Sequence, residues 1–297
     1  MDKPVDIETD IQKAKQQQLL GRMAAAGKFK KSLPRVDPQQ FPLWHDKFRG
    51  LPNAMARSAL FTCANPRDAR EQFKDHKVVS LSNYSIHYTG EELRQDDEDV
   101  FLQIVHIARN FVCGEVIEIT GNQLLRLLKW GNSKKDYVRL RSIINRLKIA
   151  VVYIRSNDGT GGYSGNMIRK FIWQNEDEAG DESKRVKWKL YLEPEIINLF
   201  ANDAFTILEW HRRSQLGWLA KWLHSFYHTH ERPYPYTTKA FHALSGSKAK
   251  DLRGFRRDLK NAHEKLYEIE FLKEWVYNPE TDTFIVERRG IIPKLAA

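Results

Sequence analysis

The stretch SKKDYVRLRSIINRLKIAVVYIRSNDGTGGYSGNMIRKFIWQ, residues 133 to 174, decides the fold that the sequence predicts. Its first part predicts an amphipathic helix, with basic side chains on one face and, on the other, Tyr137, Leu140, Ile144 and Leu147. Two apolar runs follow, AVVYIR and MIRKFIW, with the glycine-rich loop NDGTGGYSG between them. Because glycine tolerates positive φ, this loop suits the connection between a strand and a returning strand.

Three shorter elements are predicted before this helix. Apolar residues recur at helical spacing over residues 97–110, where an acidic first turn suits the helix dipole. VIEIT alternates as a short strand, and Thr120 with Gln123 has the spacing of a capping box before a second short helix that ends at Gly131. The predicted order is helix, strand, helix, helix, strand, loop, strand, which is that of a winged helix.

The same order recurs further along the chain. A long buried helix is predicted to end near HTHERPYPY, and the short helix TTKAFHALSG follows it. Residues 247–269, SKAKDLRGFRRDLKNAHEKLYEI, predict a third helix, and residues 271–288 predict a hairpin turned at NPETD. We therefore predict an α+β chain with two tandem winged-helix domains, residues 96–193 and 194–297, after a largely flexible N-terminal region, residues 1–95.

The N-terminal region has sparse, aperiodic apolar residues and predicts at most one short helix, over residues 16–26. We expect order to begin near EELRQDDEDV, residues 91–100. The region also holds a basic cluster, Lys28, Lys30, Lys31 and Arg35. That cluster either adds contacts to a nucleic-acid backbone or is a solvated tail.

Composition restricts the classes of function. The 297 residues carry 48 Lys and Arg against 38 Asp and Glu, a formal charge of +10 that favours a polyanionic partner. Apolar runs stay short of the roughly 20 residues that span a bilayer, so we expect no membrane partner. The polar start MDKPVDIETD differs from a secretory signal. Cys63 and Cys113 lack the spacing of a disulfide framework or zinc site, which fits the cytoplasm, and we expect no cofactor or metal.

The third helix of each predicted domain carries the candidate DNA-binding residues, because an α-helix fits the major groove of DNA. In the first domain they are Lys134, Lys135, Arg139, Arg141, Ser142 and Arg146. In the second domain they are Lys248, Lys250, Arg253, Arg256, Arg257 and Lys260. A solvated basic face explains one such helix, but two in equivalent positions favour sequence-specific duplex binding. Two unequal helices on one chain predict a non-palindromic site of roughly 20 base pairs.

Three stretches carry a resemblance to a known family: LPNAMARSALFTCANPRD, KWGNSKKDYVRLRSIINRLK and HALSGSKAKDLRGFRRDLKNA. They resemble the TrfA-type replication initiators of broad-host-range bacterial plasmids. The resemblance implies binding as a monomer to direct repeats, the iterons, of a plasmid origin. It also implies opening of an adjacent A·T-rich region, recruitment of the host helicase with help from the host initiator, and dimerisation as an inactive form. Single-stranded origin DNA is a further candidate partner.

The resemblance also suggests a function for RSALF, residues 57–61. Family members contact the host sliding clamp through a short motif that ends in Leu-Phe, matched here by Leu60 and Phe61. Arg57 stands where the clamp-binding consensus prefers glutamine, which predicts weak binding. The alternative is that Leu60 and Phe61 cover the first winged helix, and both interpretations stay open.

Two other classes of protein remain to be weighed. His228, His230 and the nearby Tyr227 and Tyr234 resemble the paired histidines and tyrosine nucleophile of rolling-circle nickases. However, Thr229 separates the histidines where nickases have a bulky apolar residue, so we expect helix-end histidines and no enzyme. A winged-helix transcriptional repressor that binds an operator as a dimer is the main alternative function.

Overall fold

The structure is a computed structural model that describes residues 40–81, 84–156, 162–173, 187–201 and 204–289. The basic cluster, the expected helix at residues 16–26 and the glycine loop tip at residues 157–161 lie outside these residues. The helices are α2 (Asn53–Ala56), α3 (Gln95–Ala108), α4 (Gly121–Leu128), α5 (Lys134–Ile149), η2 (Pro194–Phe200), α6 (Trp210–Arg213), α7 (Trp218–His228), α8 (Thr238–Leu244) and α9 (Leu252–Glu268). The strands are β1 (Phe48–Pro52), β2 (Phe61–Thr62), β3 (Gln72–Val78), β4 (Tyr84–Glu91), β5 (Leu93–Arg94), β6 (Ile117–Ile119), β7 (Val151–Ser156), β8 (Gly162–Asn166), β9 (Ile168–Ile172), β10 (Trp188–Leu192), β11 (Phe205–Glu209), β12 (Tyr236–Thr237), β13 (Leu272–Asn278) and β14 (Thr283–Arg288).

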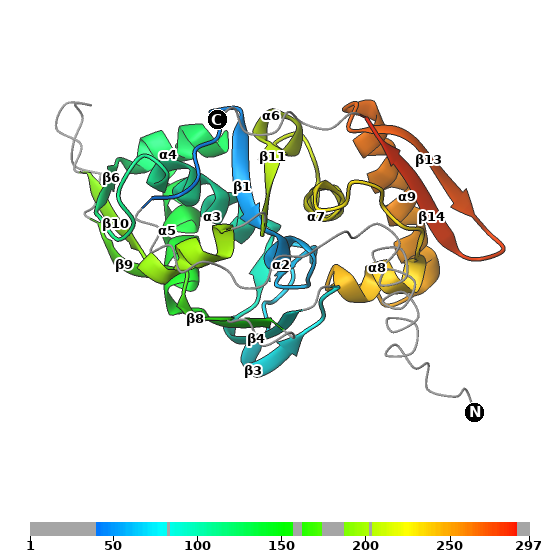
Figure 1. Cartoon of the computed structure of the whole chain (residues 1–297), viewed down its shortest axis with the longest axis horizontal. Helices are drawn as coiled ribbons and strands as arrows, with labels where there is room; N and C mark the ends of the chain where they lie inside the picture. The colour runs from blue at the N-terminus through cyan, green and yellow to red at the C-terminus, as the bar shows by residue number, and fades with distance from the viewer. Residues whose placement is uncertain (1–39, 82–83, 157–161, 174–186, 202–203, 290–297) are drawn as a thin grey trace, which may run out of the picture.

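Two hydrophobic cores organise the described chain. The first core includes buried residues from Phe41 to Trp210, and the second includes buried residues from Leu216 to Val286. Figure 1 shows α3, α4 and α5 at one end of the long axis and α9, β13 and β14 at the other. Because η2 and β11 pack in the first core, the two units divide between Trp210 and Leu216, later than the expected boundary at residues 193 and 194.

The centre of the first core is α3. Val100, Phe101 and Ile104 have no exposed surface, and the charged residues of the first turn are buried as well. A buried charge is unstable unless it is paired, so the start of α3 must meet cations from other elements.

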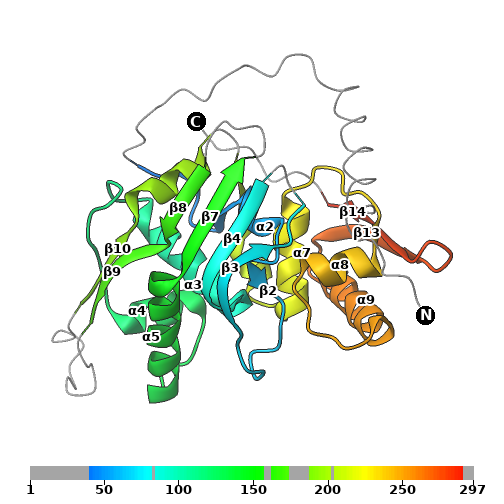
Figure 2. The ribbon, with the colours of Figure 1, turned by 90° about the horizontal axis from the view of Figure 1, so that it is seen from below.

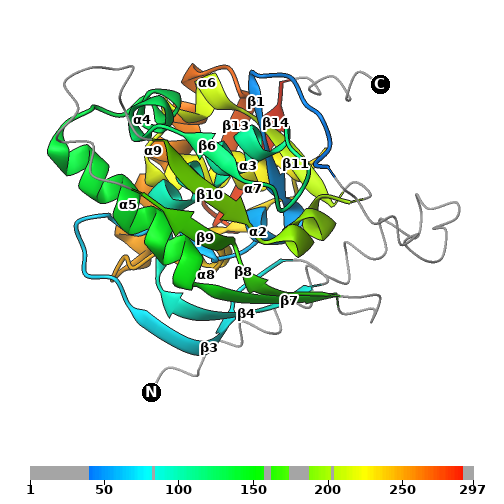
Figure 3. The same cartoon turned by 90° about the vertical axis from the view of Figure 1, so that its left-hand side faces the viewer.

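The two larger sheets of the first core have the strand orders β6-β10-β9 and β3-β4-β7-β8. Figure 3 shows the second of these sheets below the first. The expected return of MIRKFIW onto AVVYIR is therefore wrong: β7 pairs with β8 and β4, whereas β9 pairs with β10. The competing partner is β10, in which Trp188, Leu190 and Leu192 are all buried and form one continuous apolar face.

The second core packs α7, α8 and α9 against a sheet of order β12-β14-β13. Strand β12, between α7 and α8, pairs with the last strand, β14. Strand β14 in turn pairs with β13, which follows α9. The first unit has the same order in α3, β6, α4, α5, β9 and β10, with the hairpin β7–β8 inserted after its third helix.

The expectation that order begins near Glu91 is wrong, since the chain is structured from residue 40. Strand β1 pairs with β11, β2 pairs in parallel with β5, and β3 and β4 extend the sheet of β7. Trp44, Leu51 and Phe61 are buried in the first core. Short strands that belong to three different sheets share no single periodicity, which is why their residues resemble a flexible segment when only the sequence is considered.

The two cores meet at α7 and at the turn between α8 and α9. Helix α7 packs against α2 and α3 on one side and α9 on the other, and Trp222 Nε1 donates to the carbonyl of Ser58 at 3.1 Å. In the turn, the carbonyl of Ser245 accepts from Cys63 N at 2.9 Å. Gly246 has a φ of 60°, and a Cβ there would lie 2.6 Å from Thr62 Cγ2. The turn before α9 is thus held tightly on the first core.

Among the described residues, no helix combines the length and the apolar character that crossing a membrane requires.

Candidate nucleic-acid interface

Helix α5 begins after the N-cap residue Ser133. The backbone N and Oγ of Ser133 donate to Asp136 Oδ2 at 3.0 and 2.6 Å, and the hydrogen bonds from Ser133 hold the pKa of Asp136 below its ordinary value. The apolar face of α5 packs against α3 and β9. Lys134, Lys135 and Ser142 lie on the polar face, where Lys134 and Lys135 are exposed, as a DNA contact requires.

Two arginines of α5 lie over tryptophan rings. The guanidinium carbon of Arg139 is 3.9 Å from the centroid of Trp130, and Nη2 is 3.3 Å from Asp96 Oδ2. The Arg139 side chain is still 40% exposed. The guanidinium carbon of Arg141 is 4.4 Å from the centroid of Trp173. Such cation–π contacts orient a guanidinium before any ligand arrives.

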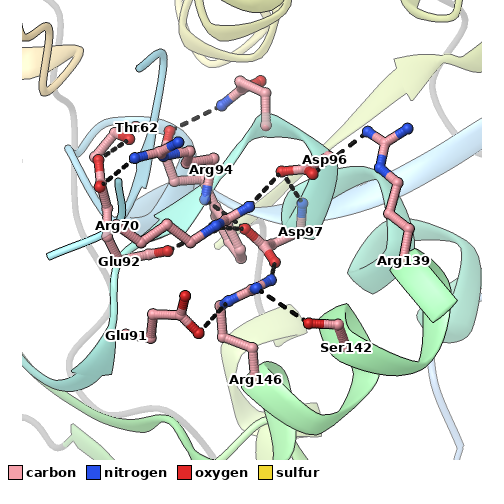
Figure 4. Close-up of polar contacts among 12 residues, drawn as sticks. Thr62, Arg70, Glu91, Glu92, Arg94, Asp96, Asp97, Arg139, Ser142 and Arg146 are labelled. Atoms are coloured by element: carbon pink, nitrogen blue, oxygen red, sulfur yellow. Dashed lines mark hydrogen bonds and ion pairs between the residues drawn. The ribbon is translucent and has the colours of Figure 1, made fainter. Parts of the chain in front are cut away.

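Arg146 is the exception on α5, because its side chain faces carboxylates of the first core and not the solvent. Its side chain is only 8% exposed, Nη1 lies 2.5 Å from Asp97 Oδ1 and Nε lies 2.9 Å from Glu91 Oε2. Figure 4 shows Arg146 turned toward these carboxylates. Arg146 therefore joins α5 to the start of α3.

The run Asp96, Asp97, Glu98 and Asp99 forms a buried ion-pair centre between the two cores. Arg70 donates to Asp97 Oδ2 at 2.6 Å and to Asp96 Oδ1 at 3.1 Å on the side of α5. The sequence predicts only that this acidic run suits the dipole of α3, and it does not predict the cations that pair with the run.

On the side of α7, the same run holds two further cations. Arg213 Nε lies 2.7 Å from Asp99 Oδ1, and Lys221 Nζ pairs with Asp99 Oδ2. Burial opposes the ionisation of Asp99, but Lys221 and Arg213 hold its pKa below the ordinary value. One acidic helix start therefore contacts cations of both cores.

In the second unit, α9 starts at the N-cap Asp251, whose Oδ1 accepts from Gly254 N at 2.6 Å. Its apolar face is buried in the second core. Lys250, Arg253 and Arg257 are exposed, and the Arg257 side chain is 75% exposed. These three cations lie at the surface, at and near the start of α9.

Arg256 and Lys260 contact the hairpin instead. Arg256 Nε donates to Asp282 Oδ1 at 2.8 Å, and Lys260 Nζ lies 4.1 Å from the centroid of Tyr277. Asp282 Oδ1 also accepts from Tyr277 Oη at 2.9 Å and from Thr238 Oγ1 at 2.7 Å. These two cations fix α9 on the β13–β14 hairpin, and they are less accessible than Arg257.

Lys248 lies in the turn between α8 and α9 and has carboxylate partners in the first core. Its Nζ lies 2.8 Å from Glu92 Oε2 and 3.0 Å from Glu71 Oε1, and its side chain is 30% exposed. In the structure its ammonium group therefore makes a contact between the cores.

The clamp-binding candidates lie inside the protein. Leu60 and Phe61 are 3% and 1% exposed, and the Phe61 ring stacks on Phe101 with centroids 6.1 Å apart. Both residues pack in the first core, which is the position that the alternative interpretation gives them. Neither side chain is accessible to a clamp in this conformation.

Tyr234 is 41% exposed, but the other three nickase candidates are buried. His228, His230 and Tyr227 are 8%, 7% and 1% exposed, and Tyr227 Oη lies 2.7 Å from His263 Nε2. In the part of the chain that the structure describes, no three His, Cys, Asp or Glu side chains are grouped as metal ligands. These residues pack within the second core and do not line an open site.

Figure 2 shows α5 and α9 at the same lower edge of the molecule, with α3 and β3 between them. The exposed candidates Lys134, Lys135, Lys250, Arg253 and Arg257 belong to these two helices and to the residue pair that precedes α9. One edge of the protein therefore presents two separated cationic helices.

Fold and surface together define a mixed α/β protein of two helix-and-hairpin units, each with a cationic third helix. The chain belongs to the TrfA protein family, which matches residues 4–282, and this confirms the resemblance found in the sequence. It is 27% identical over 266 residues to the plasmid replication initiator protein TrfA of Escherichia coli. That match covers 88% of this chain and 66% of that protein, so the chain spans just under two thirds of the length of this relative.

Two solved structures share the fold. A crystal structure of domains 2 and 3 of RctB, from selenomethionine derivatives, matches with a TM-score of 0.54 and 14% identity over 81% of this chain and 99% of that chain. A second structure of RctB domains 2 and 3 matches with a TM-score of 0.50 and 15% identity over 76% and 92% of the respective chains.

Proposed function

We propose that this protein is a plasmid replication initiator that binds duplex origin DNA through α5 and α9, each the recognition helix of a winged-helix unit. The observation that carries the proposal is the exposure of two cationic helices on one edge (Figure 2). Membership of the TrfA family supports the replication function. The arrangement of each unit, with its helices against a three-stranded sheet, supports the winged-helix assignment.

The two helices differ in sequence and belong to one chain, so a single protein molecule would bind a non-palindromic site. We propose that α5 and α9 enter successive major grooves, about 10 base pairs apart, on one direct repeat of the origin. Arginines would contact guanine edges and lysines would contact phosphates. The repeats would be iterons, each bound by a monomer, and a dimer would be the inactive form.

Opening of an adjacent A·T-rich region would follow from DNA bending, which costs on the order of 1 to 6 kcal/mol for a site of this length. The host helicase, recruited with the host initiator, would then enter, and single-stranded origin DNA would become a further ligand. This function places the protein in the bacterial cytoplasm. A sliding-clamp contact is not assigned to Leu60 and Phe61, because both are buried.

The experiment is selection of duplexes from a random library by the purified full chain, with the mass of the retained complex measured. One protein molecule on a two-part, non-palindromic duplex is the expected result. A dimer on an inverted repeat would indicate a repressor instead. No enrichment at moderate salt would refute duplex recognition by α5 and α9.

A further inference from the structure

Glu91 and Glu92 are neighbours in the chain, but they contact cations of different cores. Glu91 Oε2 accepts from Nε of Arg146, on α5, at 2.9 Å. Glu92 Oε2 accepts from Nζ of Lys248, in the turn before α9, at 2.8 Å. Two consecutive side chains at the end of β4 therefore connect the two candidate DNA-binding helices.

Several contacts hold Glu92 in place. Its Oε2 also accepts from Arg94 Nη2 at 2.8 Å, and its Oε1 accepts from Thr62 Oγ1 at 2.9 Å. Arg70 Nη1 donates to its carbonyl at 2.6 Å and to Asp97 Oδ2 at 2.6 Å (Figure 4). Burial acts to raise the pKa of Glu92, but hydrogen bonds from Arg94 and Lys248 lower it to about 2. Glu92 is thus a fixed carboxylate at neutral pH.

The Lys248 side chain is held by fewer contacts than Glu92, since its ammonium group pairs only with Glu92 and Glu71 among the described residues. It is 30% exposed, whereas Glu92 is 1% exposed. The buried carboxylate is therefore the fixed partner, and the lysine is the link that brings the turn and α9 to it. The hydrogen bond between Cys63 N and the Ser245 carbonyl, 2.9 Å, holds the same turn from its other end.

We propose that Glu92 and Lys248 are positioning residues that fix the spacing and rotation between α5 and α9, so that the protein accepts a single distance between the two halves of its DNA site. This inference rests on the proposed function and adds a determinant of specificity to it. It assigns Lys248 a part in recognition without a contact to DNA.

The physical basis is effective concentration. When one helix is bound, a stiff connection presents the other at high local concentration to one position on the duplex and at low concentration elsewhere. A single inserted base pair moves the second half-site by about 3.4 Å and rotates it by roughly 35°. A rigid pair of helices cannot follow that change, whereas a loosened pair can.

The experiment uses the full chain and the duplex obtained by selection, together with versions in which one or two base pairs are inserted or removed between the half-sites. The wild-type protein is expected to bind the original spacing at least about tenfold more tightly than the altered ones. Lys248→Met keeps the aliphatic stem but removes the ammonium group. It should reduce this preference to under about threefold, while its affinity for the isolated second half-site stays unchanged.

Two variants serve as controls. Lys248→Arg retains the charge and should retain the spacing preference. Lys250→Ala removes an exposed lysine two residues away and should weaken binding to every spacing alike, with the preference preserved. If Lys248→Met does not fold, as judged by circular dichroism, the double variant Glu71→Gln/Glu92→Gln neutralises both carboxylate partners of Lys248 and tests the same link from the other side, with the same reduction of the preference expected.

The outcomes separate the two proposals. Equally weakened binding of Lys248→Met to every spacing and to the isolated half-site would show that Lys248 is an ordinary phosphate contact and overturn the inference. A wild-type protein that binds all spacings equally would also overturn it. Failure to select any duplex would refute the proposed function itself.

Discussion

The guanidinium carbon of Arg139 lies 3.9 Å from the centre of the Trp130 ring, and this contact orients the arginine before DNA is present. The ion pair with Asp96, 3.3 Å, restrains the other side of the same guanidinium. An arginine fixed in this way gives up little conformational freedom when it binds a base edge.

Replacing Trp130 by leucine should weaken binding to the selected duplex, because the aromatic face that orients Arg139 is then absent. The cation–π contact is worth about 0.5 to 1 kcal/mol at a partly exposed site, so affinity should fall about two- to fivefold. Trp130→Phe should recover part of the lost affinity. Equilibrium binding measures the effect, and an equal fall in affinity for leucine and phenylalanine would exclude the aromatic contribution.

Arg253 and Arg257 are expected to supply base contacts from α9, whereas Lys135 on α5 supplies a phosphate contact. Arg253→Ala or Arg257→Ala should lower the preference for the selected duplex over random DNA, by about 1 to 3 kcal/mol for each arginine that reads a base. Lys135→Ala should weaken binding to both duplexes equally and reduce the salt dependence. Binding to both duplexes at two salt concentrations tests this division, which an equal weakening on both duplexes for the arginine variants would contradict.

Arg146→Ala should destabilise the protein, because the buried Asp97 would lose the partner at 2.5 Å that favours its charged form. Removing one member of a buried pair costs about 3 to 5 kcal/mol. Urea unfolding followed by tryptophan fluorescence measures the change. Ser142→Ala, one turn earlier on the same helix, is the matched control and should leave the midpoint nearly unchanged. A stable Arg146→Ala protein with weakened DNA binding would restore Arg146 to the interface.

Four of the buried histidines should make the fold sensitive to mild acid. Burial lowers the pKa of His106 to about 3 and of His263 to about 4, and it holds the pKa values of His224 and His228 well below 6.5. Each imidazole is neutral in the folded protein but binds a proton near pH 6.5 when unfolded. The contribution of these histidines to the free energy of unfolding is therefore fully present above pH 6.5. Below pH 6.5 the free energy of unfolding falls by up to about 1.4 kcal/mol per pH unit for each histidine.

Urea midpoints between pH 7.5 and 5.5 test this dependence. His224→Leu is the informative variant, because Nδ1 of His224 is buried without a hydrogen-bond partner and the ring packs on Phe271. The stability of the variant should fall less steeply with decreasing pH than that of the wild type. Identical slopes would show that His224 does not contribute.

Local signals in the sequence were sufficient to predict several elements. Apolar residues at helical spacing placed the third helices within residues 133–149 and 247–269, and the structure confirms them as α5 and α9. The hairpin at residues 271–288, predicted from its turn at NPETD, is confirmed as β13 and β14. The exposed cations lie on the polar faces of these two helices, opposite the apolar residues, so the same spacing predicts them.

The errors concern partners that are distant in sequence. Lys248 and Glu92 are 156 residues apart, and Arg146 and Asp97 are 49 residues apart. A basic residue on the polar face of a helix has the same local signature whether its partner is DNA or a buried carboxylate. The pairing of β9 with β10, rather than with β7, is equally a choice between partners that local alternation does not distinguish.

Under the proposed function, the conformation of Gly246 at the joint between the two cores has a consequence for plasmid inheritance. Its φ of 60° and the 2.6 Å that would separate an added Cβ from Thr62 mean that alanine strains the joint without changing any charge. Strain of about 1 to 2 kcal/mol lowers the melting temperature by only a few degrees in a protein of this size. Under the proposed function, cells carrying Gly246→Ala should inherit the plasmid normally in the cold and lose it on warming, a conditional phenotype that arises without the loss of any charged residue.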